Sequence, residues 1–227
     1  MIRETTPAEL LGALNDFEER NAPASLWIRG DAEILTNGGR VSIVGSRNAS
    51  SSGLNRASRL ARLLCLEGIV IVSGLAKGID TASHTAAIES GGKTVGVIGT
   101  AIDKYYPREN RSLQESIATE HLLVSQFAPG ARTYGSSFTQ RNRTMALIAD
   151  ATVIVEAGEK SGTIHQGWEA IRLGRPLFIM KSLVDTDLKW VRDMMYYGAS
   201  LLSDDTVEDL IAAVPPRVSA GEDVFAF

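Results

Sequence analysis

The sequence predicts an α/β protein with a doubly wound, mostly parallel sheet of the extended Rossmann-like type and helices on both faces. From Arg40 onward, apolar and β-branched runs alternate with helical segments. The runs have no polar face, which is typical of parallel strands that are covered on both sides. Right-handed crossovers between such strands place the connecting helices on both faces of one sheet.

Six strands are predicted, each from a short apolar run that is bounded by turn residues. They span residues 41–44, 69–72, 94–98, 122–124, 152–155 and 177–180. Helices are expected between them, over 54–66, 79–90, 111–119, 137–149 and 162–173. Gly68 and the pair Gly91-Gly92 suit the ends of the first two helices, since glycine readily adopts the left-handed conformation found there.

The flanks of this core are expected to be simpler. Residues 1–39 are predicted to form a short N-terminal helical and connecting segment, with a helix over 5–20 that starts at Thr6-Pro7 and a connection over 27–35. Residues 40–212 are expected to form the Rossmann-like domain, and residues 213–227 a flexible tail. Late apolar residues fit either a dimer face or a last helix packed on the sheet: Trp190, Met194, Met195, Tyr196 and Tyr197.

Composition limits the class of protein. The chain of 227 residues is 44% hydrophobic and 22% charged, an ordinary balance for a globular protein. The single cysteine, Cys65, lies in an apolar run and is expected to be a buried thiol in a reducing compartment. No apolar stretch is long enough to span a bilayer, and residues 1–19 do not resemble a signal peptide. We therefore expect a cytoplasmic protein with no membrane partner.

Small and hydroxyl residues with isolated cations follow several strands, at the edge where ligands of such folds bind. Glycine lets backbone N–H groups approach an anion, and a helix N-terminus favours negative charge. Each loop alone also fits an ordinary capped turn, but together they predict a phosphate-bearing ligand. The residues are Gly45, Ser46 and Arg47 after the first strand, Ser73, Gly74 and Lys77 after the second, Gly99 after the third, and Ser161, Gly162 and Thr163 after the fifth.

Other motifs argue against cofactor and metal chemistry. The glycines do not form the G-x-G-x-x-G pattern of a dinucleotide site, so no such cofactor is expected. His84, His121 and His165 are scattered, which predicts no metal site. Asp80 and His84 lie one helical turn apart and fit a catalytic dyad or a structural hydrogen bond. Without a nucleophile beside them, we predict no catalytic residue and no enzymatic activity.

The helix predicted near residue 137 carries an aromatic ring and two cations. Phe138 can stack on a base or fill the core. Arg141 and Arg143 lie two residues apart, about 200° around the helix, so that both cannot face one spot. One of them is therefore expected to form a salt bridge. The formal net charge of −4 counts against a uniformly basic nucleic-acid binder, but the acidic residues gather near the two ends of the chain.

These blocks resemble the DNA-processing protein A family (DprA, also called Smf). The matching residues occur in the family's order between about residues 25 and 182: 41–47, 72–80 with His84, 96–99 with Tyr106-Pro107, Phe138 with 141–143, and 153–157 with Ser161-Gly162. The resemblance implies an extended Rossmann-like domain that binds single-stranded DNA, commonly as a homodimer, and helps to load the recombinase RecA in natural transformation. It implies DNA-pocket roles for Arg47, Ser73, Gly74, Lys77, Phe138, Arg141 and Asn142.

The chain also departs from the family pattern. Ser125-Gln126 replaces a Ser-Glu pair, Lys181-Ser182 replaces a Pro-Gly pair, and residues 163–168 replace a run of small residues. No appended winged-helix-like module is recognised after Val184. The alternative hypothesis is a sensor of small nucleotides or an enzyme that resembles the phosphoribohydrolases of the LOG family. Gln166 stands where the catalytic acid of those enzymes lies, which leaves His165 or Glu169 for such chemistry.

Overall fold

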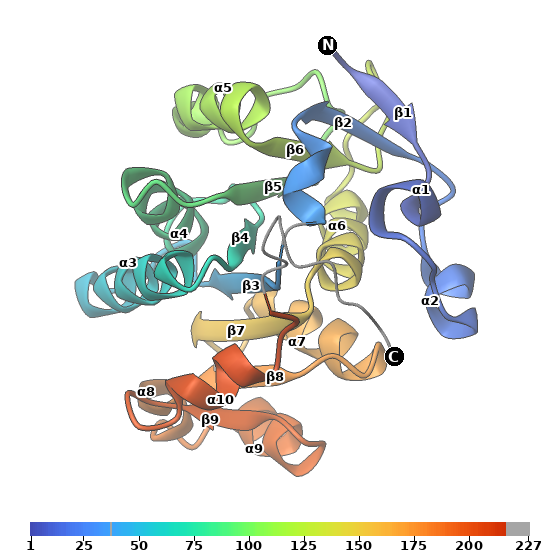
Figure 1. Ribbon diagram of the computed structural model, residues 1–227. Helices are drawn as coiled ribbons and strands as arrows, with labels where there is room; N and C mark the ends of the chain where they lie inside the picture. Colours follow the sequence, from blue (N-terminus) through green and yellow to red (C-terminus); the bar gives the residue numbers. More distant parts are fainter. Residues whose placement is uncertain (37, 217–227) are drawn as a thin grey trace, which may run out of the picture.

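A nine-stranded sheet organises residues 1–36 and 38–216, the part of the chain that the computed structural model describes (Figure 1). The strand order is β1-β2-β6-β5-β4-β3-β7-β8-β9. From β6 to β9 every neighbouring pair is parallel, and β1 and β2 are antiparallel additions at one edge. The strands are β1 Arg3–Thr5, β2 Leu26–Gly30, β3 Arg40–Gly45, β4 Val70–Ser73, β5 Thr94–Ile98, β6 Leu122–Ser125, β7 Ala151–Glu156, β8 Leu177–Met180 and β9 Ser200–Leu202.

Helices cover both faces of this sheet, so the predicted fold class is confirmed. The helices are α1 Pro7–Leu11, α2 Asp16–Asn21, α3 Ser51–Leu66, α4 Ile79–Glu89, α5 Arg111–Glu120, α6 Gly135–Ile148, α7 Thr163–Arg172, α8 Lys181–Val184, α9 Lys189–Tyr196 and α10 Val207–Ala212, with 3₁₀ turns at Ala32–Leu35 and Arg108–Asn110. Helices α3 and α4 lie on one side in Figure 1, and α6 lies on the other. None of the described helices is both long and apolar enough to cross a membrane.

The two faces explain why the central strands lack a polar side. In β3, Val41 and Ile43 pack with α3 and α4, whereas Val44 belongs to the core on the opposite face. In β7, Val153 packs on the same face as Val41 and Ile43, and Ile154 packs on the opposite face with Val44. Successive side chains of a strand point to opposite faces, so burial on both faces requires a continuous apolar run.

The N-terminal residues differ from the prediction. Residues 27–35 were expected to connect, but Leu26–Gly30 is strand β2, which pairs antiparallel with β6. Leu26 and Ile28 are buried while Trp27 is only partly buried, the alternation of a strand with one face on the core. The expected helix over 5–20 is two helices, because Gly12 ends the first at φ +85°. Thr6 and Pro7 begin α1 as predicted.

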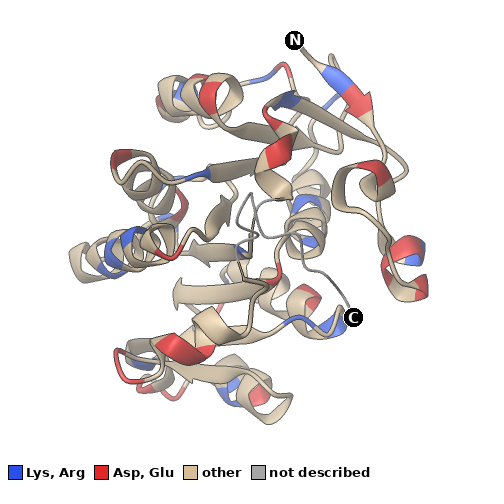
Figure 2. Ribbon diagram, viewed as in Figure 1, with Lys and Arg blue, Asp and Glu red and all other residues tan. Residues whose placement is uncertain are grey.

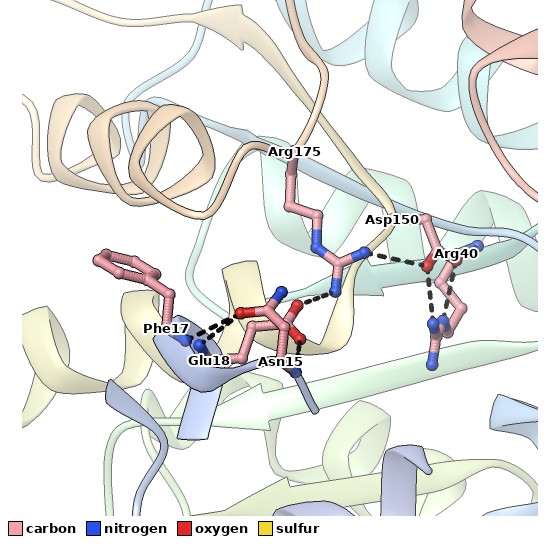
Figure 3. Close-up of polar contacts among 6 residues, drawn as sticks. All are labelled: Asn15, Phe17, Glu18, Arg40, Asp150 and Arg175. Carbon is pink, nitrogen blue, oxygen red and sulfur yellow. Dashed lines mark hydrogen bonds and ion pairs between the residues drawn. The ribbon is translucent and has the colours of Figure 1, made fainter. Parts of the chain in front are cut away.

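An ion-pair network joins α2 to the sheet (Figure 3). Arg175 donates to Glu18 at 2.5 Å and lies 3.8 Å from Asp150. Asp150 also accepts from the backbone and guanidinium of Arg40, at 2.8 and 2.7 Å. The Asp150 side chain is 6% exposed, so these charges are shielded from water and hold the N-terminal residues against the body of the fold.

The C-terminal residues complete the same sheet. Helix α9 buries Trp190, Val191 and Met194, as expected for a last helix packed on the sheet. Tyr196 and Tyr197 instead remain 86% and 62% exposed. Strand β9 and helix α10 follow and were not predicted. Of the expected tail, residues 217–227 lie outside the described residues. The Cys65 thiol is partly buried, and burial raises its pKa to about 11, so it stays protonated at neutral pH.

Candidate nucleic-acid interface

A cavity of about 550 Å³ opens beyond the carboxyl ends of β3 and β7. These strands are neighbours, but the chain winds from β3 toward β4, β5 and β6 and from β7 toward β8 and β9. The cavity therefore lies at the topological switch point, where doubly wound sheets bind their ligands. Its walls are the loop after β3, the loop after β7, and the facing sides of α6 and α7.

Many of the predicted residues meet in this cavity, and some do not. The lining includes Gly45, Ser46, Arg47, Phe138, Arg141, Asn142, Ser161, Gly162 and Thr163. It also includes residues that the sequence analysis did not select for binding, among them Asn48, Asp80, Thr139, Lys160 and Gln166. Five predicted residues lie outside the lining: Ser73, Gly74, Lys77, Gly99 and Arg143.

The loop after β3 is shaped by close packing at Gly45. A Cβ atom there would lie 2.5 Å from Ile79 Cγ1 and 2.9 Å from the Glu156 carbonyl oxygen, so only glycine fits. The Ser46 N–H donates to that carbonyl at 2.6 Å and is not free to bind an anion. Arg47 is exposed, and its guanidinium carbon lies 5.7 Å from the centroid of the Phe138 ring. Arg47 is thus the group in this loop that is suited to a phosphate.

Arg141 lines the cavity as a buried cation that is held by structural partners, and its expected contact with DNA stays a prediction. The residue is 6% exposed, and its Nη1 donates to the carbonyl oxygens of Gly74 and Val97. Its Nε donates to Asn142 Oδ1 at 3.0 Å. Burial lowers the pKa of Arg141 and raises that of Asp80, and the positive charge of Arg141 opposes the shift of Asp80.

The loop after β4 reaches the cavity through Ala76, but its predicted residues Ser73, Gly74 and Lys77 lie outside the lining. The Ser73 hydroxyl is buried and donates to the Ile43 carbonyl oxygen at 2.7 Å. The Arg141 guanidinium occupies the space where a side chain on Gly74 would start. Lys77 is exposed and pairs with Glu109 at 2.6 Å, outside the cavity lining. These three predicted residues therefore lie outside the lining, although the end of their loop packs on the backbone of Ser46 and Arg47.

Phe138 lies at the rim of the cavity. Its ring is partly buried and lies 5.3 Å from the ring of Tyr106, between centroids. Gly99 packs beneath it, since a Cβ at Gly99 would lie 2.7 Å from Phe138 Cδ1. Gly99 thus serves the ring and not the ligand directly. The Phe138 ring is partly buried and partly exposed, and its expected stacking on a base stays a prediction.

Arg143 is the salt-bridge partner that the helical spacing anticipated. It points toward α7 and pairs with Glu169 at 3.2 Å. Glu169 also accepts from Arg172 at 2.8 Å. Arg143 lies outside the cavity lining, so its position does not support the expected role in binding phosphate.

The loop after β7 contributes Lys160, the cation that sequence reasoning missed. Lys160 is exposed and lines the cavity, and neither it nor Arg47 forms an ion pair with any described residue. The Thr163 N–H donates to the Ser161 hydroxyl, and the Gly162 carbonyl oxygen accepts from Asn142 Nδ2 at 3.1 Å. These bonds fix the start of α7 at the cavity wall, with Lys160 beside it.

Asp80 and His84 do not form a catalytic dyad. His84 is fully buried, its Nδ1 bonds to the Thr94 hydroxyl at 2.7 Å, and burial lowers its pKa to about 3. Asp80 instead accepts from the Ala76 N–H at 3.3 Å. Both residues have structural partners. Among the described residues, no group of three or more His, Cys, Asp or Glu side chains is arranged to hold a metal ion.

Comparison with known proteins agrees with this architecture. The sequence model of the family described as DNA recombination-mediator protein A matches residues 7–215. DNA processing protein DprA of Bacillus subtilis is 35% identical over 196 residues, which cover 86% of this chain and 65% of the relative. The DprA protein of Streptococcus pneumoniae is 37% identical over 193 residues, covering 85% and 67%. The chain thus spans about two thirds of the length of these relatives.

Solved structures show the same relationship. DNA processing protein A of Streptococcus pneumoniae superimposes with a TM-score of 0.77 at 32% identity, covering 92% of this chain and 74% of that one. DNA processing protein A of Helicobacter pylori, described for its single-stranded DNA binding mode, gives 0.78 at 25% identity and covers 93% and 97%. A molybdenum cofactor binding protein of Rippkaea orientalis shares only the fold, with a TM-score of 0.57 at 18% identity. The chain belongs to the DNA recombination-mediator protein A family.

Proposed function

We propose that this chain binds single-stranded DNA in the cavity between β3 and β7, as a step in DNA processing and recombination. The observation that carries the proposal is the pairing of two unneutralised cations, Arg47 and Lys160, with the partly exposed ring of Phe138 at one opening. Family membership and the single-stranded DNA binding described for the Helicobacter pylori relative support the same ligand.

The chemistry of these groups suits a single strand. Arg47 and Lys160 can neutralise backbone phosphates, and the start of α7 favours negative charge. The Phe138 ring offers a face on which an unpaired base can stack, which a base inside a duplex cannot reach. Neither interaction depends on base identity, so these rim contacts are expected to bind many sequences.

The acidic net charge is compatible with this proposal, because charge is distributed unevenly over the fold. Figure 2 shows Lys and Arg on α3 and α6, whereas α1, α2 and α10 carry acidic residues. The α3 arginines are paired with Glu156, Asp204 and Glu89, so the expected attraction of a phosphate rests on Arg47 and Lys160, which form no ion pair with a described residue. Screening limits the reach of other exposed charges to about 10 Å at moderate salt.

The test is fluorescence anisotropy of a labelled thymidine oligomer, single-stranded and double-stranded, across a salt series. The single strand is expected to bind more tightly, with an affinity that falls as salt rises. Free nucleotides are added as competitors in the same experiment. Lack of DNA binding at low salt would contradict the proposal, and displacement of a labelled nucleotide would then favour the small-nucleotide alternative.

The resemblance to DprA proteins extends the proposal to two partners, a RecA-type recombinase and a second copy of the chain. Its support is family membership. The exposed Tyr196 and Tyr197 at the end of α9 provide an apolar surface that suits a homodimer. Sedimentation of the protein and RecA filament formation on DNA coated with single-strand-binding protein address these finer parts separately from DNA binding.

Phe138→Ala is expected to weaken single-strand binding by about 1–3 kcal/mol, because it removes the stacking face. The free energy of unfolding is expected to change little, since the ring is partly exposed at the rim. Anisotropy titration and thermal unfolding measure the two effects. Phe138→Trp, which keeps an aromatic face, is the matched control and should bind like the parent chain. A large fall in stability without a change in binding would place the ring in the fold instead.

A further inference from the structure

Gln166 lies in the first turns of α7 and lines the cavity wall from the side of that helix. Its side chain is 1% exposed and lines the cavity with the apolar residues Val44 and Met145. Neither its Nε2 nor its Oε1 has a hydrogen-bond partner among the described residues. A buried side-chain amide with both polar atoms unpaired is uncommon, because such groups are nearly always satisfied.

The neighbouring polar groups are already engaged and do not satisfy this amide. Asn142 uses its Nδ2 on the Gly162 carbonyl oxygen, and its Oδ1 accepts from Arg141. The Thr163 N–H is bonded to the Ser161 hydroxyl. A hydrocarbon side chain of similar size would avoid the cost of the unpaired amide. The amide of Gln166 is therefore suited to a ligand that completes its hydrogen bonds.

We propose that Gln166 reads the hydrogen-bonding edge of one nucleobase that enters the cavity. This inference rests on the proposed function and deepens it. The amide presents a donor beside an acceptor, and a nucleobase edge presents an acceptor beside a donor. An ionised phosphate only accepts, so it would leave Gln166 Oε1 without a donor. The apolar surfaces of Val44 and Met145 suit the faces of a base and not an anion.

The cavity then has two kinds of contact. The exposed Arg47 and Lys160 hold the strand by its phosphates at the opening, and Gln166 contacts a base edge inside. The rim contacts are indifferent to sequence, whereas a paired amide discriminates between bases that can and cannot complete its bonds. Binding should consequently depend on the polar edge of the base as well as on charge and stacking.

The experiment compares two hexamers in the anisotropy assay. One contains thymine, and the other carries 2,4-difluorotoluene at every position, which keeps the shape and stacking face of thymine but not its hydrogen-bonding edge. The parent chain is expected to bind the thymine hexamer about tenfold more tightly. Gln166→Met, which has a similar volume and no amide, should bind both hexamers alike. Gln140→Met removes an exposed amide of α6 outside the cavity lining and should behave like the parent chain.

Thermal unfolding separates a reading role from a structural one. Gln166→Met is expected to unfold at the same or a higher temperature, because it removes an unpaired buried amide. Equal binding of both hexamers by the parent chain overturns the inference even if the variant does not fold. So does discrimination that survives in Gln166→Met, or a variant that melts at a lower temperature. Failure of the parent chain to bind either hexamer would instead refute the proposed function on which the inference rests.

Discussion

Replacement of Arg141 by Met is expected to lower the free energy of unfolding by about 3–5 kcal/mol, the usual cost of breaking a buried charge arrangement by removing one side. The substitution leaves the carbonyl oxygens of Gly74 and Val97 without their donor. It also removes the positive charge that opposes the raised pKa of Asp80. For a chain of this size, the loss corresponds to a fall in Tm of roughly 6–20 °C. Thermal and denaturant unfolding measure it.

Arg143→Met is the matched control for this prediction. Arg143 lies on the same helix, but its side chain is 45% exposed. When Arg143 is replaced, Arg172 still pairs with Glu169. The expected cost of Arg143→Met is within about 1 kcal/mol, as for other exposed ion pairs. Equal losses in the two variants would show that Arg141 is not the structural cation that its contacts indicate. A loss of DNA binding in Arg141→Met at unchanged stability would show instead that Arg141 is a direct ligand.

The central sheet was predictable because a strand buried on both faces has a strong sequence pattern. In the run from Val41 to Val44 only Ser42 is polar, and a short apolar run of this kind between two turns is typical of a buried strand. Strand β2, which lies between β1 and β6, gave a weaker signal. Its residues Leu26 and Ile28 alternate with Trp27 and Arg29, and aromatic and long side chains blur the contrast between buried and exposed positions.

The cavity's position was predictable from the glycine-rich loops, but the assignment of individual residues was not. A sequence shows that an arginine is near a strand end, not whether its guanidinium meets solvent or a carbonyl oxygen. Arg141 and Lys77 are predicted phosphate ligands, yet Arg141 donates to the carbonyl oxygens of Gly74 and Val97 and Lys77 pairs with Glu109. These partners are distant in the sequence and could not be foreseen from it. Lys160 lies in a predicted loop, but only the structure shows that it lines the cavity without an ion pair to a described residue.

The double variant Arg47→Ala with Lys160→Ala is expected to weaken single-strand binding by about a hundredfold at low salt, from the loss of two charge-assisted contacts. The slope of log affinity against log salt should become shallower by about 1.4, since each phosphate neutralised on a single strand contributes about 0.7. Stability should be retained, because neither side chain forms an ion pair with a described residue. The anisotropy titration across salt gives both quantities.

The control is Arg59→Ala with Lys189→Ala, which removes the same two kinds of charge from the surface outside the cavity. Arg59 pairs with Asp204 at 3.3 Å and Lys189 with Asp193 at 2.7 Å, so both cations are already neutralised locally. The two double variants have the same net charge, and any effect of the overall field must therefore be equal in both. A loss of single-strand affinity in Arg47→Ala with Lys160→Ala alone would indicate that the cavity binds the phosphates. Equal losses of affinity in the two double variants would mean that DNA binding follows total charge. The proposal that the single strand binds in the cavity would then be wrong.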